Sequence, residues 1–161
     1  TVMSNLGLER FLNQRGISME RTQVGDRYVV ERMRKSGFNL GGEQSGHIIL
    51  SDFSTTGDGL IAGLQFLAEI IRSERSSKEL ARVFEPVPQL LKNASYEAGS
   101  DPLAKPNVIK AIKEAEAKLK NNGRILIRKS GTESLIRVMA ESEDEEKMNV
   151  AVDSVVTEIT A

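Results

Sequence analysis

Residues 124–141 read RILIRKSGTESLIRVMAE, two apolar segments separated by a short polar stretch that contains a glycine. The first segment, 124–128, and the second, 135–141, have the composition of β-strands. The residues between them, 129–134, are mostly turn-formers, which indicates that the two strands form a hairpin. This hairpin, together with the helical patterns beside it, decides the fold of the second half of the chain.

Helical periodicity flanks the hairpin on both sides. Pro106 stands where a first helical turn tolerates proline, and the pattern that follows ends at Gly123. Its apolar stripe consists of Val108, Ile112, Ala115 and Leu119. After the hairpin a last helix is predicted from the stripe Met148, Val152, Val155 and Ile159. With a weaker strand at 90–96, the order βαββα predicts a small α+β domain with an antiparallel sheet and two helices.

All four prolines fall in one short stretch, at Pro86, Pro88, Pro102 and Pro106. Proline fixes φ and removes a hydrogen-bond donor, so this clustering marks a connection between elements. We place a domain boundary within 83–88 and expect two domains, 1–85 and 86–161.

The first domain has an alternating pattern of strands and helices. Short strands are predicted at 2–3, at 18–24 and at 47–50, where the last follows a glycine-rich run. A helix through Leu8, Phe11 and Leu12 is expected to end at Gly16. This alternation predicts the α/β class.

Two further helices complete the first domain. One is predicted at 28–35 and closes at Gly37. The other begins after Asp58, and its apolar positions fall on one face, which we interpret as a core face. They are Leu60, Leu64, Leu67 and Ile71.

Composition excludes several classes of protein. The 161 residues carry a formal net charge of −1, which argues against nucleic-acid binding through bulk positive charge. Cysteine is absent, so disulfides, thiolate metal sites and cysteine nucleophiles are excluded, and a cytoplasmic location is expected. The most apolar stretch, 59–71, is too short to span a bilayer. Because the sequence opens with Thr1 and no initiator Met, we expect a piece of a longer protein.

The hairpin carries a candidate anion site. Arg128 ends one strand and Arg137 lies near the start of the next, so a register is available that brings both guanidinium groups to the same edge of the sheet. Between them Gly131 permits backbone N–H groups to point into a concavity, and Ser130 and Thr132 add hydroxyl donors. Two planar guanidinium groups fit a phosphate dianion. The alternative is an ordinary β-turn with two solvated arginines.

A second candidate lies at 42–47, GEQSGH. Glu43, Ser45 and His47 alternate along an extended chain, so they would project to one face and contact vicinal sugar hydroxyls. A metal site is a rival interpretation, but one histidine and one glutamate fall short of the usual three protein ligands. A glycine-containing turn with a capping carboxylate is the structural alternative.

Two acidic residues near helix starts have structural alternatives as well. Asp26 and Arg27 form an acid–base pair at a strand-to-helix turn, but Asp26 is also suited to capping the helix that follows. Asp58, before an apolar helix, is expected to interact with the helix N-terminus rather than to act in catalysis.

These motifs together resemble those of a known family. Residues 42–47 resemble the sugar-binding motif of the α-D-phosphohexomutases, and 128–137 resemble their C-terminal phosphate-binding loop, Arg-x-Ser-Gly-Thr-Glu-Pro-x-x-Arg. The order and separation of the two motifs also match. Segments 1–7, 21–28 and 55–59 narrow the resemblance to the bacterial members that act on glucosamine phosphates.

The resemblance implies an isomerase of four domains, an intramolecular phosphotransferase that interconverts glucosamine 6-phosphate and glucosamine 1-phosphate. Its product leads to UDP-N-acetylglucosamine and peptidoglycan precursors. A phosphoserine in the first domain donates its phosphoryl group, and a glucose or glucosamine bisphosphate is the activating intermediate. A Mg²⁺ ion held by aspartates of the second domain assists the transfer. By this resemblance 1–85 is part of domain 3, and 86–161 is domain 4, of the TBP-like type.

The resemblance also assigns roles to residues. Glu43 and Ser45 would hold sugar hydroxyls, His47 would lie beside the reacting region, and Asp26 and Arg27 would face the sugar. The phosphate that is not being transferred would be held by Arg128, Ser130, Gly131, Thr132 and Arg137. No catalytic residue and no metal ligand is expected in this chain.

One residue departs from the family pattern. Ser134 stands where the family usually has proline, so the turn should be less rigid without loss of a phosphate contact. The phosphoserine loop and the metal loop of the family are not found in the sequence. The expected partners are therefore a phosphosugar and the missing N-terminal domains of the same enzyme, with no nucleic acid and no membrane, and the chain alone is expected to be inactive. A glucose- or mannose-phosphate mutase fragment and a non-catalytic phosphosugar-binding module are the alternatives.

Overall fold

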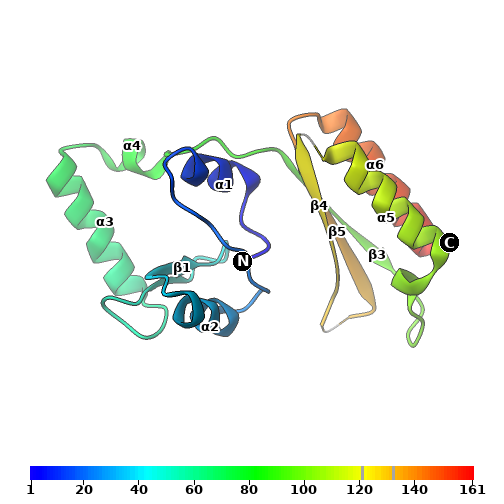
Figure 1. The fold of residues 1–161 in the computed structure, drawn as a ribbon, viewed down its shortest axis with the longest axis horizontal. Coiled ribbons are helices and arrows are strands. Elements are labelled where there is room, and N and C mark those ends of the chain that lie inside the picture. The colour runs from blue at the N-terminus through cyan, green and yellow to red at the C-terminus, as the bar shows by residue number, and fades with distance from the viewer. Residues whose placement is uncertain (121, 132) are drawn as a thin grey trace. The chain divides into compact units, whose positions relative to one another are not determined.

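The computed structural model describes residues 1–120, 122–131 and 133–161. Two compact units make up the chain, Thr1–Glu85 and Pro86–Ala161 (Figure 1). Each is described by itself. No helix among the described residues is long and apolar enough to cross a membrane.

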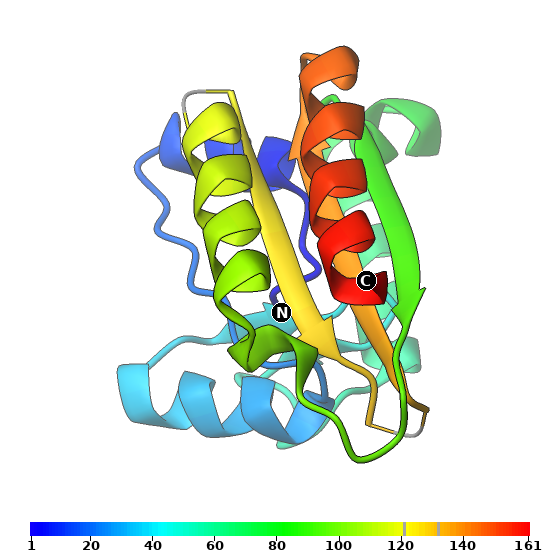
Figure 2. The same cartoon turned by 90° about the vertical axis from the view of Figure 1, so that its right-hand side faces the viewer.

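The second unit is a three-stranded sheet covered by two helices. Its elements, in chain order, are β3 (Gln89–Ser95), the 3₁₀ turn η1 (Pro102–Ala104), α5 (Pro106–Leu119), β4 (Gly123–Lys129), β5 (Leu135–Ser142) and α6 (Glu145–Thr160). The sheet is antiparallel in the order β3-β5-β4. Figure 2 shows α5 and α6 side by side on one face of it. The predicted order βαββα is confirmed.

The core of this unit lies between the sheet and the two helices. Ile136 and Val138 of β5 are fully buried against α5 and α6. The described core contains thirteen buried side chains, and the predicted stripe residues Val108, Ala115 and Leu119 belong to it. All four stripe residues predicted for the last helix are buried in the same cluster: Met148, Val152, Val155 and Ile159. Burial of this much apolar surface is the main source of stability for a small domain.

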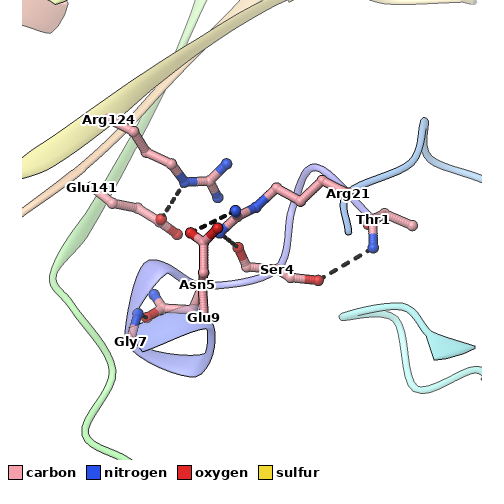
Figure 3. Close-up of polar contacts among 8 residues, drawn as sticks. All are labelled: Thr1, Ser4, Asn5, Gly7, Glu9, Arg21, Arg124 and Glu141. Carbon is pink, nitrogen blue, oxygen red and sulfur yellow. Dashed lines mark hydrogen bonds and ion pairs between the residues drawn. The ribbon is translucent and has the colours of Figure 1, made fainter. Parts of the chain in front are cut away.

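Two features of this unit were not predicted from the sequence. Gly123 lies inside β4 and does not end α5, and a Cβ there would come within 2.2 Å of the Glu141 carbonyl oxygen. Glu141, the last residue of the predicted strand 135–141, is fully buried in β5, and its Oε2 accepts a 2.6 Å hydrogen bond from Arg124 Nε (Figure 3). A buried carboxylate needs such a partner, because it loses its hydration.

The first unit consists of four helices and one small hairpin. The elements are α1 (Leu6–Asn13), α2 (Asp26–Ser36), β1 (Leu40–Gly42), β2 (Ile48–Leu50), α3 (Gly59–Ser73) and α4 (Ser77–Ala81). Strands β1 and β2 pair antiparallel, with Gly42 opposite Ile48. Gly37, with φ of 71°, ends α2 in the left-handed conformation, as predicted.

The described core of this unit is small. Val29 and Met33 of α2 pack on Ile49 of β2, with Phe38 partly buried beside them. Gly41 allows this contact, because a Cβ at that position would lie 2.4 Å from Met33 Sδ and 2.5 Å from Val29 Cγ1. The strand β1 therefore approaches α2 more closely than any other residue type at position 41 would permit.

Helix α3 does not contribute to this core. No residue of α3 is buried, and the stripe predicted as a core face is largely exposed, from 55% at Leu64 and Leu67 to 79% at Ile71. The interpretation as a core face is therefore wrong for the described residues. The helix itself was predicted correctly, since its N-terminus is fixed by Asp58, whose carboxylate accepts from the Leu60 and Ile61 amides at 2.9 and 3.0 Å.

Two predicted strands are absent from the described structure. Residues 2–3 lie in a turn and 18–24 have no regular structure. The Val2 N–H donates a backbone hydrogen bond to the Thr22 carbonyl at 2.8 Å. The second segment is held by side chains instead. Arg21 pairs with Glu9 at 2.7 Å and donates to the Ser4 carbonyl at 3.3 Å (Figure 3). Apolar residues without a partner strand do not form a ladder.

Candidate functional site

The hairpin of the second unit places its two arginines opposite each other. In the register of β4 and β5, Arg128 is the direct cross-strand partner of Arg137. Directly opposed residues of an antiparallel pair have their side chains on the same face. The neighbours of Arg137 in β5, Ile136 and Val138, point into the core against the helices. Both guanidinium groups therefore lie on the same face of the sheet, opposite to α5 and α6.

This arrangement is electrostatically unfavourable without an anion. Two like charges directly opposite each other in a sheet are destabilising. Among the described residues neither Arg128 nor Arg137 has an ion pair with a carboxylate, whereas the adjacent Lys129, on the other face, pairs with Asp101 at 2.9 Å. Both arginines are partly exposed and accessible to a ligand.

The register adds a residue that the sequence analysis did not single out. On the other side of β5, Asn93 of β3 is the direct partner of Arg137. One row across the sheet thus carries Asn93, Arg137 and Arg128, and the Asn93 side chain is exposed. The signal that could have found it is the register of two strand pairs, and the sequence alone does not fix that register.

The loop between the strands differs from the expected cup of backbone donors. The N–H group of Ser130 donates to the Leu135 carbonyl at 2.7 Å, which closes the hairpin and withdraws this donor from a ligand. Gly131 does not adopt a left-handed conformation, and a Cβ there would meet nothing within 4 Å. The glycine leaves open space over the loop but is not required by the backbone. Thr132 lies outside the described residues.

The second candidate site is the turn of the β1–β2 hairpin. The Glu43 N–H donates to the His47 carbonyl at 2.9 Å, and the Gly46 N–H donates to the Glu43 carbonyl at 3.0 Å. Gly46, with φ of 99°, makes this turn possible. The segment is therefore a tight turn, and not the extended chain in which alternate side chains would share a face.

The turn nevertheless brings the three predicted side chains together. Ser45 Oγ lies 3.1 Å from His47 Nδ1, and Glu43 Oε2 lies 3.8 Å from the same nitrogen. Ser45 and His47 are exposed, and the side chain of Glu43 is only 9% exposed. A hydroxyl, an imidazole and a carboxylate thus converge at the tip of one hairpin.

The 25–27 segment joins this cluster. The N–H of Gly25 donates to Glu43 Oε1 at 2.8 Å. Asp26 and Arg27, both exposed, follow at the first turn of α2. The guanidinium of Arg27 lies 4.5 Å from the centre of the Tyr28 ring and donates to the Tyr28 hydroxyl, which raises the pKa of Arg27 above its ordinary value. Gly25, and not Asp26, is the N-cap residue of α2, but Asp26 Oδ1 accepts the first-turn N–H of Arg27 at 2.7 Å, which is close to the structural alternative.

Metal ligands are not grouped in the part of the chain that the structure describes. No cluster of three or more His, Cys, Asp or Glu side chains is placed to hold an ion among residues 1–120, 122–131 and 133–161. The residues of the two candidate sites are instead suited to binding an anion and neutral hydroxyl groups.

Two family models together match almost the whole chain. Residues 1–87 match the family model of phosphoglucomutase/phosphomannomutase, alpha/beta/alpha domain III, and 71–158 match that of the phosphoglucomutase/phosphomannomutase C-terminal domain. The chain belongs to the phosphoglucomutase/phosphomannomutase family. The turn at 43–47 lies in the part that matches domain III, and the arginine pair lies in the part that matches the C-terminal domain.

Similar phosphohexomutases are found among curated proteins. The phosphoglucosamine mutase of Ruegeria sp. (strain TM1040) is 69% identical over 161 residues, which is 100% of this chain and 36% of the relative. That of Paracoccus denitrificans (strain Pd 1222) is 64% identical over 159 residues, 99% of this chain and 36% of the relative. The chain therefore spans little more than a third of the length of these relatives.

Solved structures support the phosphohexomutase fold. The N-acetylphosphoglucosamine mutase of Aspergillus fumigatus matches 98% of this chain with a TM-score of 0.78 and 17% identity, over 37% of its own chain. A phosphoglucomutase/phosphomannomutase family protein of Burkholderia thailandensis matches 98% with a TM-score of 0.68 and 19% identity, over 36% of its chain. The predicted fold, parts of domains 3 and 4 of a phosphohexomutase, is confirmed.

Proposed function

We propose that the chain is the substrate-holding C-terminal part of a phosphoglucosamine mutase, which interconverts glucosamine 6-phosphate and glucosamine 1-phosphate. Identity of 62–69% to phosphoglucosamine mutases over nearly the whole chain supports the substrate class. The observation that carries the role of this chain is the opposed pair Arg128–Arg137, which has no carboxylate partner among the described residues. We assign 1–85 to part of domain 3 and 86–161 to domain 4.

The arginine row binds the phosphate group that stays on the sugar. Each planar guanidinium can donate two parallel hydrogen bonds to phosphate oxygens, and the dianion removes the repulsion between the two arginines. The hydroxyl groups of Ser130 and Thr132 and the open space over Gly131 complete this site, and Asn93 supplies an amide beside Arg137. By binding and neutralising this phosphate group, the arginine row holds the sugar in position.

The hairpin turn binds the sugar itself. The exposed Ser45 hydroxyl and the His47 imidazole donate to and accept from sugar hydroxyls, and the second oxygen of Glu43 accepts from one. Asp26 and Arg27 border the same turn. These contacts fix the orientation of the sugar ring.

The chemical step belongs to the remainder of the enzyme. A phosphoserine and a Mg²⁺ ion outside this chain supply phosphoryl transfer, and a glucose or glucosamine bisphosphate is the activating intermediate. The described residues of this chain do not group as ligands of the metal. The product would serve UDP-N-acetylglucosamine and peptidoglycan synthesis in the bacterial cytoplasm. The chain alone is proposed to be inactive.

An amide NMR titration of the 161-residue chain with glucosamine 6-phosphate tests the phosphate site. Saturable shifts are expected around 129–133, and Arg128→Ala or Arg137→Ala should weaken binding about tenfold or more, because each removes charged hydrogen bonds. Lys129→Ala is the matched control, since Lys129 lies next in the strand on the opposite face; it should leave binding within about twofold. Unphosphorylated glucosamine should cause no shifts at 129–133.

The full-length enzyme provides the complementary test. It should convert glucosamine 6-phosphate in preference to glucose 6-phosphate and mannose 6-phosphate, and the 161-residue chain should give no turnover. Preference for a hexose phosphate would reassign the substrate. An equal loss of activity in Lys129→Ala and Arg128→Ala would show that the arginine row is not the phosphate site.

A further inference from the structure

Helix α2 begins at a residue that lacks a capping side chain. Gly25 is the N-cap, with φ of 128°, a backbone conformation that L side chains rarely adopt. Most helices satisfy their first amide groups with a Ser, Thr, Asp or Asn side chain at this position. Gly25 offers only its carbonyl, which accepts from the Tyr28 and Val29 amides at 3.0 and 3.4 Å.

Asp26 Oδ1 accepts the first-turn N–H of Arg27 at 2.7 Å, whereas the N–H of Gly25 itself is bound from the β1–β2 hairpin. Glu43 is 18 residues away in sequence, and its Oε1 accepts the Gly25 N–H at 2.8 Å. The carboxylate also stands at the positive end of the α2 dipole, where a negative charge is stabilised. With only 9% of its side chain exposed, Glu43 faces the protein more than a ligand.

This contact fixes the position of two exposed residues. Asp26 and Arg27 follow Gly25 directly, and their backbone direction depends on where Gly25 is held. Arg27 is in turn oriented by its contacts with the Tyr28 ring and hydroxyl. The same carboxylate places Oε2 3.8 Å from His47 Nδ1 at the tip of the hairpin.

We propose that Glu43 is a positioning residue that fixes the Gly25–Arg27 segment against the hairpin turn, so that Asp26 and Arg27 are held beside the proposed sugar-binding turn. The inference rests on the proposed function. It assigns to Glu43 a role that acts through Arg27, in addition to the sugar contact of its second oxygen.

A double-mutant cycle in the full-length enzyme tests the coupling. Glu43→Ala and Arg27→Ala should each lower kcat/KM, by roughly 10- to 100-fold for loss of a charged hydrogen bond. The double variant should be no worse than the more damaged single variant, because both changes remove the same action. Glu43→Gln keeps an oxygen acceptor for the Gly25 N–H and should restore most of the activity. Gln44→Ala, an exposed neighbour in the turn, is the control and should behave as wild type.

The Gly25 amide provides a readout that does not depend on turnover. In the 161-residue chain, its proton resonance and protection from exchange should change in Glu43→Ala and be retained in Glu43→Gln. Multiplicative losses in the double variant, or an unchanged Gly25 amide in Glu43→Ala, would overturn the inference. An inactive wild-type enzyme with a Gly25 amide that still responds would instead overturn the proposed function and leave the contact standing.

Discussion

The two units of the chain differ in the size of the apolar core that stabilises them. In the second, a described core of thirteen buried side chains joins α5 and α6 to the sheet. In the first, three buried side chains join α2 to the hairpin, and α3 leaves its apolar stripe exposed. Helix caps are present in both units, at Asp144 of α6 and at Asp58 of α3. The comparison teaches that local signals are sufficient to set helix boundaries, whereas stability depends on what covers the apolar faces.

The strongest test of this comparison is to separate the units. We expect 86–161 alone to unfold in one cooperative urea transition, with a stability of about 4 kcal/mol or more. We expect 1–85 alone to show no cooperative transition, because its described core is too small to offset the conformational entropy of the chain. Far-ultraviolet circular dichroism during urea titration measures both. A sharp transition in 1–85 would refute the contrast.

The same substitution in each unit gives a matched pair. Leu119→Ala removes a side chain that is 2% exposed and should cost about 2–5 kcal/mol. Leu67→Ala in α3, where the side chain is 55% exposed, should change stability by no more than about 0.5 kcal/mol. Urea unfolding of the 161-residue chain measures each variant. An equal loss in Leu67→Ala would mean that α3 is covered in solution.

Two glycines of the first unit sharpen the contrast within it. Gly41→Ala would place a Cβ against Met33 and Val29 and should destabilise the unit by about 1–3 kcal/mol. Gly63→Ala lies in the open interior of α3 and should instead stabilise it by about 0.5–1 kcal/mol. Thermal melts of the two variants decide the sign. A stabilising Gly41→Ala would show that β1 is not held against α2.

The smallest expected effect concerns helix caps, which should be alike in the two units. Hydrogen bonds from Lys147 hold the pKa of Asp144 below its ordinary 3.8, and those from Ser76 hold the pKa of Glu79 below its ordinary 4.5. Since both folded-state pKa values are lowered, the contribution to stability is present above the ordinary values and is lost as pH falls through the lowered ones.

Carboxyl NMR titration of Asp144 and Glu79 measures these pKa values directly. Ser76→Ala should return the pKa of Glu79 toward 4.5 and leave that of Asp144 unchanged. A Glu79 that titrates at 4.5 in the wild-type chain would contradict the capping box of α4.

Much of the second unit could be predicted from sequence because its signals are local and consistent. The stripe from Val108 to Leu119 has a helical period, and 124–141 has two strands around a turn, so pattern and packing agree. The burial of Glu141 in β5 was not predicted. Charge along the sequence does not indicate that Arg124 would compensate a buried carboxylate.

The first unit shows what periodicity does not report. The stripe of α3 correctly predicted a helix, but an apolar face says nothing about what covers it. The strands expected at 2–3 and 18–24 failed for a related reason, since strand formation depends on a partner. At 43–47 the side chains converge as predicted, but through a turn made possible by Gly46. Asn93 could not be placed beside Arg137 from the sequence, because its position depends on the register of two strand pairs.

The opposed arginines of the proposed phosphate site should couple anion binding to the stability of the second unit. Repulsion between Arg128 and Arg137 lowers the free energy of unfolding of the second unit. An anion bound between them removes this repulsion and restores the stability. Substrate occupancy and resistance to unfolding are therefore linked quantities in this hairpin. Divalent oxyanions should raise the melting temperature more than chloride does at the same ionic strength. Melting temperatures measured at increasing anion concentration would then report the binding affinity.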